Sequence, residues 1–342
     1  MPNPNLNIII IEENVPFVRG LADAYANVRY LAPEAIDADA VRDADALIIR
    51  TRTRCDHNLL DRSRCKLIAT ATIGTDHIDL PYCQARGITV VNAPGCNAPA
   101  VAQYVFASLL AVINRPLADL TIGIVGVGHV GSIVANWARS LEMKVMLCDP
   151  PRSRREGGRD WYGLDEIAAK ADIITFHTPL TRTGEDRTFH LVDADFIGKL
   201  RRTPIIINSA RGPIVDTQAL VEGIRRGKTG PVVIDCWENE PDIDPTLLHL
   251  AAIATPHIAG YSRQGKIRAS QAALDAVTTM FMLPRLTVAE AMPPAPARAV
   301  SVADIMESYD PQADTAVLKD SASTFEYQRN HYALRDEVAE RR

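Results

Sequence analysis

Residues 121–131 read TIGIVGVGHVG, and residues 144–151 read KVMLCDPP. A short apolar run leads into a glycine-rich turn, a helix-length stretch follows, and a second apolar run ends at Asp149. The turn has the G-x-G-x-x-G spacing of a dinucleotide site, which allows a tight turn, close approach of a pyrophosphate and packing of the helix on its strand. Its three glycines are Gly126, Gly128 and Gly131. Because strand, turn, helix, strand and acid occur in this order, the stretch predicts a dinucleotide-binding unit.

Asp149 indicates which dinucleotide is expected. A carboxylate at this position hydrogen-bonds the ribose hydroxyls and repels a 2′-phosphate, so NAD is predicted rather than NADP. Three arginines that follow closely offer an alternative, in which they would bind that phosphate: Arg152, Arg154 and Arg155. Our default interpretation of these arginines is a solvated loop.

The composition is that of a globular protein with two or three domains. The chain has 342 residues, 47% hydrophobic and 23% charged, which is ordinary for a folded protein. A net charge of −5 argues against non-specific binding of nucleic acid. No apolar run approaches the roughly 20 residues that span a bilayer, and no signal peptide is recognisable. We therefore expect a cytoplasmic protein. Its six cysteines lack metal-binding spacing, so we predict reduced thiols and no metal site.

Apolar runs alternate with helical stretches along most of the chain, which predicts an α/β protein with parallel strands joined by crossover helices. We expect two Rossmann-like, doubly wound domains. The first is a discontinuous substrate domain, 1–98 with 259–284, in which 15–26 is predicted to be helical. The second is a dinucleotide domain over 99–258. Residues 285–342 are expected to be a linker and a short C-terminal region ending in a polar helix, which docks on a partner or is partly mobile.

Three charged residues follow strands of the dinucleotide domain, at the edge where an open parallel sheet binds its ligands: Arg211, Glu240 and His257. Each alone is unremarkable, but together they suit hydride transfer from an alcohol. Histidine changes protonation near neutral pH and can take the hydroxyl proton. A neighbouring carboxylate would orient the ring, and arginine can hold a substrate carboxylate.

With these residues the sequence resembles the D-2-hydroxyacid dehydrogenases. The likeness covers residues 7 to about 280 and rests on the blocks GVGHVG, CDPP, FHTPL, NSARGPIVD, DCWENEP and TPHIAGYS. The resemblance implies that Arg211 binds the substrate carboxylate, Glu240 orients the histidine and His257 performs acid–base catalysis.

Further blocks narrow the resemblance to the branch of the family that oxidises 4-phospho-D-erythronate with NAD in pyridoxal 5′-phosphate biosynthesis. These blocks are TATIGTDHID, APGCNAPAV, LCDPP and HIAGYSRQGK. By motif position, the substrate would contact Thr51, Thr72 and Tyr261. The cofactor would contact Asp149, Thr178, Asp235 and Gly260, together with the amides around His129 and Val130.

The resemblance also implies a homodimer. The tail is shorter than the dimerisation domain that the family leads us to expect, although FEYQRNHYALRDE (325–337) is similar to its final part. Thr51 stands where serine is expected, which preserves a hydroxyl.

The stretch Arg50-Thr51-Arg52-Thr53-Arg54 bears on the phosphate of the substrate. Period-two spacing at the end of a strand would place alternate side chains on one face, where arginines would bind a phosphorylated acid. We favour Arg50 or Arg52 over Arg54. The alternative is a solvent-facing loop.

Two other functions remain open at this point. A dehydrogenase of the same family acting on phosphoglycerate, glycerate or glyoxylate would share the fold, the cofactor and the three charged residues. A protein that senses NAD(H) and regulates partners would share the scaffold without needing catalysis.

Overall fold

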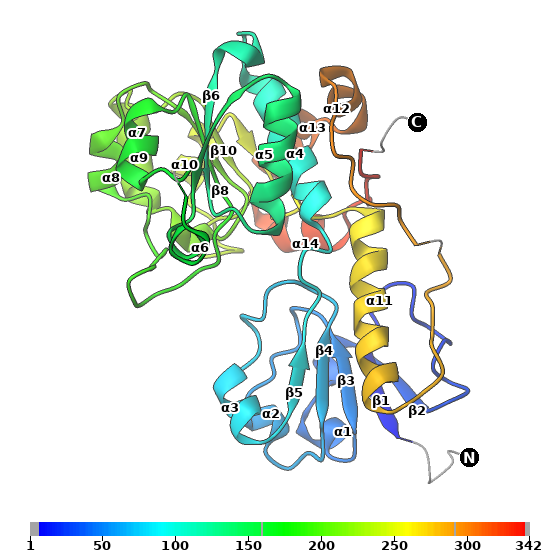
Figure 1. Ribbon diagram of the computed structural model, residues 1–342. Helices are drawn as coiled ribbons and strands as arrows, with labels where there is room; N and C mark the ends of the chain where they lie inside the picture. The colour runs from blue at the N-terminus through cyan, green and yellow to red at the C-terminus, as the bar shows by residue number, and fades with distance from the viewer. Residues whose placement is uncertain (1–6, 159, 291, 339–342) are drawn as a thin grey trace. The chain divides into compact units, whose positions relative to one another are not determined.

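The computed structural model describes residues 7–158, 160–290 and 292–338. The chain forms two compact units, and each is built around its own parallel sheet (Figure 1). Unit 1 comprises Met1–Asn97 and Arg263–Ala295, and unit 2 comprises Ala98–Ser262 and Pro296–Arg342. Residues 285–342 are therefore shared between the units rather than grouped as one region. The predicted α/β class with parallel sheets is confirmed. Among the described residues, no helix combines the length and apolar character that crossing a membrane requires.

The sheet of unit 1 has the strand order β2-β1-β3-β4-β5. Its strands are β1 (Ile8–Glu12), β2 (Asn27–Leu31), β3 (Ala46–Ile49), β4 (Leu67–Thr70) and β5 (Thr89–Val91). The helices are α1 (Ala38–Val41), α2 (His57–Leu60), α3 (Leu80–Ala85) and α11 (Arg263–Met280), with a 3-10 turn η1 (Pro33–Ala35). Side chains of β1 alternate between two cores: Ile9 and Ile11 pack in the cluster that includes α11, and Ile10 packs in the cluster on the other side.

The helix predicted for residues 15–26 is wrong, because the chain there forms successive turns. Pro16 lies near the start of the stretch, and both Phe17 and Gly20 have positive φ angles, 64° and 83°. A left-handed backbone conformation interrupts the hydrogen-bond ladder of an α-helix. Val15, Val18, Ala22 and Ala26 are nevertheless buried, which explains why the spacing of this segment resembled a helix face.

The sheet of unit 2 has the order β11-β10-β9-β8-β6-β7. Its strands are β6 (Thr121–Val125), β7 (Lys144–Cys148), β8 (Ile173–Phe176), β9 (Ile205–Asn208), β10 (Val232–Ile234) and β11 (Ile253–Ala254). The first strand in sequence, β6, lies between β7 and β8, so the direction of winding reverses there. In an open parallel sheet this reversal is where ligands bind.

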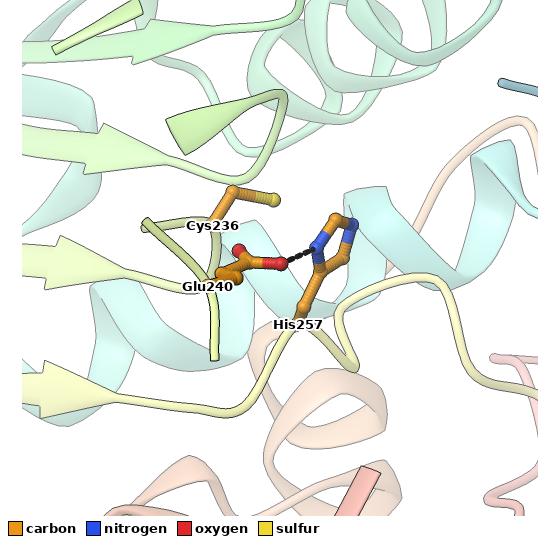
Figure 2. Close-up of side chains that lie close together, drawn as sticks. All are labelled: Cys236, Glu240 and His257. Atoms are coloured by element: carbon orange, nitrogen blue, oxygen red, sulfur yellow. Dashed lines mark hydrogen bonds and ion pairs between the residues drawn. The ribbon is translucent and has the colours of Figure 1, made fainter. Parts of the chain in front are cut away.

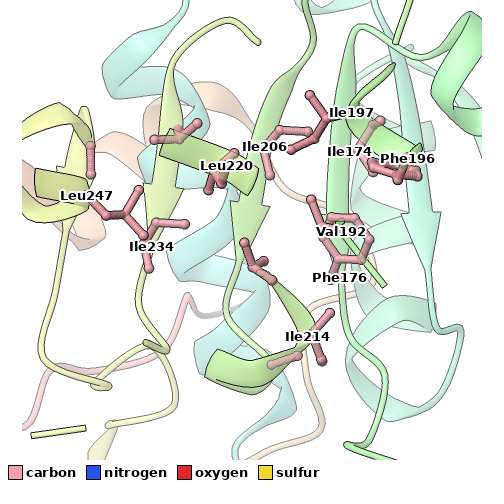
Figure 3. Close-up of a cluster of buried hydrophobic side chains, with 14 of the residues drawn as sticks. Ile174, Phe176, Val192, Phe196, Ile197, Ile206, Ile214, Leu220, Ile234 and Leu247 are labelled. Carbon is pink, nitrogen blue, oxygen red and sulfur yellow. The ribbon is translucent and has the colours of Figure 1, made fainter. Parts of the chain in front are cut away.

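Helices cover both faces of this sheet (Figure 1). One core packs against α4 (Ala98–Val112) and α5 (His129–Ser140). The other core, shown in Figure 3, packs against α7 (Leu164–Lys170), α8 (Ala194–Lys199), α9 (Thr217–Arg225) and α10 (Pro245–Leu250). The remaining elements before the tail are α6 (Pro150–Glu156), η2 (Leu117–Asp119) and η3 (Gly212–Ile214).

The C-terminal tail, residues 296–338, packs on unit 2 of its own chain. It contains α12 (Val302–Ser308), α13 (Pro311–Asp320), η4 (Ala322–Thr324) and α14 (Phe325–Asn330). Leu318 and Phe325 enter one core of the unit, and Ile305 enters the other. Thr315 Oγ1 accepts the backbone N–H of Ala254 in the edge strand β11 at 3.0 Å. Residues 296–338 therefore find their core in unit 2 of the same chain. The expectation that this region also docks on a partner stays a prediction. The polar helix predicted for residues 325–342 is shorter in the structure, where α14 ends at Asn330. Residues 339–342 of that prediction lie outside the described residues.

Candidate active site

The glycine turn follows β6 at the reversal point of the sheet, and its three glycines meet different surroundings. Gly126 has a φ of 87°, a conformation that favours glycine. A Cβ atom at Gly131 would lie 2.1 Å from the carbonyl oxygen of Gly126, so the start of α5 packs too closely for any side chain. A Cβ at Gly128 would have no protein atom within 4 Å. The open space is therefore at the glycine where a pyrophosphate would approach.

The N-terminus of α5 faces this turn. Gly128 is its N-cap, and His129 and Val130 are its first residues. Backbone N–H groups in the first turn of a helix have no partner within the helix, so they are available to a phosphate. Nearby, Thr178 Oγ1 is buried and has no hydrogen-bond partner among the described residues. An unpaired buried hydroxyl and an open glycine position fit a bound dinucleotide.

Asp149 caps α6 and braces the glycine turn. Its Oδ1 accepts the backbone N–H of Arg152 at 3.0 Å, and its Oδ2 accepts that of Val127 at 2.8 Å. Each carboxylate oxygen has a second lone pair for a ribose hydroxyl. The three arginines considered as a 2′-phosphate site form ion pairs with acids: Arg152 and Arg155 with Glu156, and Arg154 with Glu185 and Asp186. The expected solvated loop is wrong, because these arginines lie in helix α6 and Arg152 Nη1 donates to the Val127 carbonyl of the glycine turn at 2.5 Å. The ion pairs nevertheless leave the arginines engaged with acids rather than free for a 2′-phosphate.

Arg211 lies at the start of a loop that is locked against the loop containing Glu240. A Cβ at Gly212 would lie only 1.7 Å from the carbonyl oxygen of Trp237, so the two backbones touch. Asn208 donates from Nδ2 to the carbonyls of both Arg211 and Cys236, at 3.0 and 3.2 Å. The Arg211 side chain is half-buried, and Nη1 donates to the Ala210 carbonyl at 2.8 Å. Arg211 and Glu240, far apart in sequence, are thus carried by adjoining loops.

Glu240 and His257 form a hydrogen-bonded pair (Figure 2). Glu240 Oε2 lies 2.8 Å from Nδ1 of His257, and Oε1 accepts the Trp237 backbone N–H at 2.8 Å. Burial alone would raise the pKa of Glu240. The charge of His257, its hydrogen bond, the Trp237 N–H and the charge of Arg329 outweigh burial, so the pKa lies below its ordinary value. A carboxylate only accepts, so Nδ1 must donate. Nε2, on the far side of the ring from Glu240 in Figure 2, then has a lone pair for a proton.

The backbone around His257 is held in an unusual conformation by Asp235. His257 has a φ of 57°, in the left-handed region that non-glycine residues rarely adopt. Asp235 is 1% exposed and accepts the N–H groups of Ile258 and Ala259 at 2.7 and 3.0 Å. Burial raises the pKa of Asp235, although these hydrogen bonds act against that shift. Asp235 therefore has a structural role, because it holds the backbone that follows His257. The resemblance separately implies that Asp235 contacts the cofactor.

Cys236 lies beside this pair, and its Sγ, an oxygen of Glu240 and a nitrogen of His257 are within 4.8 Å of one another. This is a spacing that a metal ion could occupy. Burial raises the pKa of the Cys236 thiol well above its usual value, whereas metals bind the thiolate. Both oxygens of Glu240 are also engaged in hydrogen bonds. The arrangement suits an acid–base pair better than a metal site.

In unit 1, the hydroxyl of the predicted substrate contact Thr72 is held by hydrogen bonds. Its Oγ1 donates to the Gly74 carbonyl at 3.1 Å and lies 2.6 Å from Thr70 Oγ1. Thr51 is exposed in the turn after β3.

The period-two argument for residues 50–54 does not hold, because β3 ends at Ile49 and a turn follows. Arg50 donates from Nη1 to the Asn14 carbonyl at 3.2 Å, and its Nε is buried without a hydrogen-bond partner among the described residues. Arg52 instead pairs with Glu34, and the 80% exposed Arg54 side chain pairs with Asp56. Of the three arginines, Arg50 is therefore the one whose side chain has no acidic partner among the described residues.

Two tail residues that sequence analysis did not single out, Arg329 and Arg335, reach the loops of this site. Arg335 donates to the carbonyls of Ile258 and Ala259, which follow His257. Nothing in the local sequence of the tail marks these arginines, since their partners lie far away in the chain.

Comparison with known proteins agrees with this geometry. Residues 102–259 match the family model "D-isomer specific 2-hydroxyacid dehydrogenase, NAD binding domain". Erythronate-4-phosphate dehydrogenase of Bacteroides thetaiotaomicron is 44% identical over 338 residues, which cover 96% of this chain and 97% of that protein. The enzyme of the same name from Chromohalobacter salexigens is 46% identical over 279 residues, covering 81% of this chain and 73% of that protein.

A solved structure, D-lactate dehydrogenase from Aquifex aeolicus complexed with NAD and lactic acid, is 27% identical with a TM-score of 0.70, covering 81% of this chain and 96% of that one. The chain belongs to the D-isomer specific 2-hydroxyacid dehydrogenases, in their erythronate-4-phosphate dehydrogenase branch. The resemblance seen in the sequence is confirmed, as is the prediction of an NAD-dependent oxidoreductase.

Proposed function

We propose that the protein oxidises 4-phospho-D-erythronate to (R)-3-hydroxy-2-oxo-4-phosphonooxybutanoate in pyridoxal 5′-phosphate biosynthesis. The observation that carries the chemistry is the 2.8 Å contact between Glu240 and Nδ1 of His257, which leaves Nε2 as a base. The choice of substrate is supported by the 44% identity to erythronate-4-phosphate dehydrogenase of Bacteroides thetaiotaomicron over nearly the whole length of both chains.

In this mechanism Nε2 of His257 takes the proton of the C2 hydroxyl. Glu240 holds the ring and compensates the positive charge that the imidazole acquires. Arg211 binds the substrate carboxylate next to C2 and polarises the oxygen bonded to C2. NAD, held at the glycine turn beside Asp149 and Thr178, would supply the acceptor for the hydride of C2. On reversal the same nitrogen returns the proton to the oxygen.

The cofactor would be held by the glycine turn, Asp149 and Thr178. We further propose Asp235, Gly260 and the amides of His129 and Val130 as cofactor contacts. For substrate we propose Thr51, Thr72 and Tyr261, with Arg50 for the phosphate. Arg52 is a weaker candidate, because Glu34 already pairs with it.

The test is turnover of the purified protein with NAD and each acid separately. We expect the highest kcat/KM with 4-phospho-D-erythronate. A higher kcat/KM with 3-phosphoglycerate or glycerate, or with glyoxylate in the reverse direction, would assign the protein to another member of the family. If the protein binds NADH but oxidises none of these acids, an NAD(H)-sensing function replaces the proposal.

We also propose that the protein is a homodimer in the cytoplasm. The tail exposes large apolar side chains that a second copy would cover: Val302, Met306, Val317, Tyr327 and Leu334. All six cysteines are buried free thiols, which suits a reducing compartment. Light scattering should give twice the mass of the chain, and Val317→Asp, at a position 55% exposed, should shift it toward the monomer. A monomeric unsubstituted protein would refute the dimer.

A further inference from the structure

The end of the tail runs alongside the loop that follows His257. Ser262 and Arg335 form an isolated parallel β-bridge, and Ser262 Oγ donates to Glu337 at 2.7 Å. The rings of Tyr261 and Tyr332 meet edge to face, with centroids 6.2 Å apart. Three successive contacts thus tie residues 332–337 to residues 258–262, all within unit 2.

Arg335 is the centre of this attachment. The residue is 9% exposed, and its guanidinium donates to the Ile258 carbonyl at 3.1 Å and to the carbonyl of Ala259. The same group reaches Ala100 O at 3.2 Å and Gln103 Oε1 at 3.1 Å in α4. The charge also lies 4.4 Å from the centroid of the Tyr309 ring. Only a planar group with several donors can bind this many acceptors at once, and a lysine ammonium cannot.

The two peptide units after His257 are therefore fixed from opposite sides. Asp235 accepts their N–H groups, and Arg335 donates to their carbonyls. His257 itself has a φ of 57°, a conformation that costs roughly 1–3 kcal/mol and persists only where neighbouring contacts enforce it. Two of those contacts come from the tail.

Arg329 brings a second tail cation to the same place. Its side chain, 18% exposed, pairs with Glu326 at 3.4 Å, and its Nε is buried without a hydrogen-bond partner among the described residues. Its positive charge acts on Glu240. The helix α14 is anchored by Phe325, which is 1% exposed in the core of the unit. Arg329 is thus carried by a helix that is anchored in the core of unit 2.

We propose that Arg335 is a positioning residue of the active site. It fixes the loop of residues 257–262 so that Nε2 of His257 faces the substrate, and the charge of Arg329 supports the Glu240 carboxylate that holds the ring. The C-terminal tail is then a working part of catalysis in its own chain. This inference rests on the proposed function only in taking His257 and Glu240 as the acid–base pair.

Arg335→Lys is the first test, because it keeps the charge and removes the fork of donors. A displacement of about 1 Å in a catalytic group can cost about 10²-fold in rate, so we expect kcat to fall by about 10² with little change in KM. NADH affinity and the thermal midpoint should change much less, and guanidinium ion added to Arg335→Ala should restore part of kcat. Arg298→Ala, which removes an exposed arginine of the same tail, should leave kcat unchanged.

Arg329→Gln and Arg329→Lys form the second pair. Loss of the charge in the glutamine variant should lower kcat, whereas lysine should retain more of it. Kinetics are measured on whichever acid the unsubstituted enzyme oxidises best, so an incorrect substrate assignment leaves the test intact. Amide hydrogen exchange at Ile258 and Ala259, which needs no substrate, should rise in Arg335→Lys. Unchanged kcat and unchanged exchange in Arg335→Lys, or a loss of kcat that only follows a loss of folded protein, would overturn the proposal.

Discussion

Oε2 of Glu240 lies 2.8 Å from Nδ1 of His257, while Oε1 of the same carboxylate accepts the backbone N–H of Trp237 at 2.8 Å. One oxygen of the Glu240 carboxylate is therefore fixed by its own loop, and the other orients the His257 ring. Since Gly212 packs directly on the carbonyl of Trp237, the Arg211 loop takes part in the same arrangement.

Glu240→Gln should lower kcat by about 10² or more, because an amide neither compensates the charge of the imidazolium nor fixes which nitrogen holds the proton. NADH binding, followed by fluorescence, should be retained. A matched control is available in the same loop: Glu238 pairs with His190 at 2.7 Å, so Glu238→Gln should retain most of the activity. Equal losses in the two variants would show that Glu240 has no special role.

The glycine turn allows a paired prediction. Gly128→Ala should fold normally and bind NADH more weakly, because its Cβ meets no protein atom within 4 Å and occupies space left for the cofactor. Gly131→Ala should instead destabilise unit 2, because its Cβ would lie 2.1 Å from the Gly126 carbonyl. Thermal unfolding and NADH titration separate the two effects. A Gly128→Ala variant with unchanged NADH affinity would contradict the placement of the pyrophosphate.

Asp149→Ser should reduce the preference for NAD over NADP. Serine still caps α6, so the cost in helix stability stays small, while the negative charge facing a 2′-phosphate is lost. The measurement is the ratio of kcat/KM for the two cofactors, which should fall at least about tenfold, a difference of about 1.4 kcal/mol. An unchanged ratio would mean that Asp149 acts only as the cap of α6.

His177 is half-buried, with its Nδ1 buried and without a hydrogen-bond partner among the described residues, and should make unit 2 sensitive to mild acid. Burial lowers the pKa of His177 to about 3 from 6.5. The unfolded chain therefore takes up a proton as the pH falls below about 6.5, whereas the folded protein does not until about pH 3, so stability is lost across this window. Between pH 7 and pH 5 the free energy of unfolding should fall by about 2 kcal/mol through this residue.

His177→Gln should remove that part of the pH dependence, and the exposed His57→Gln should not. Urea unfolding followed by tryptophan fluorescence reports on unit 2, since Trp137, Trp161 and Trp237 all lie in it. The same slope in both variants would contradict the burial argument.

What could be predicted from sequence was whatever is encoded locally. The strand before Gly126, the turn and the acid at Asp149 are recognisable because glycine geometry and apolar runs act over a few residues. The failures have equally physical causes. Turns between residues 13 and 26 bury apolar side chains at a spacing that resembles a helix face. Because β3 ends at Ile49, residues 50–54 lack the extended backbone that would place alternate side chains on one face.

The contacts of the tail could not be predicted in this way. Arg335 binds carbonyls that lie 76 and 77 residues earlier in the chain, and no local pattern encodes such a pairing. Tail residues also have too little apolar surface to suggest a core of their own, and their burial becomes evident only against α4 and β11.

The attachment of Arg335 to Ile258 and Ala259 has a consequence for how the molecule is made. During translation the residues of the dinucleotide-binding fold, His257 included, are synthesised before Arg335. The guanidinium that holds the carbonyls after His257 is therefore added last. Nascent or prematurely terminated chains should therefore acquire coenzyme affinity first and turnover only later. Incomplete chains would then bind the coenzyme without oxidising substrate.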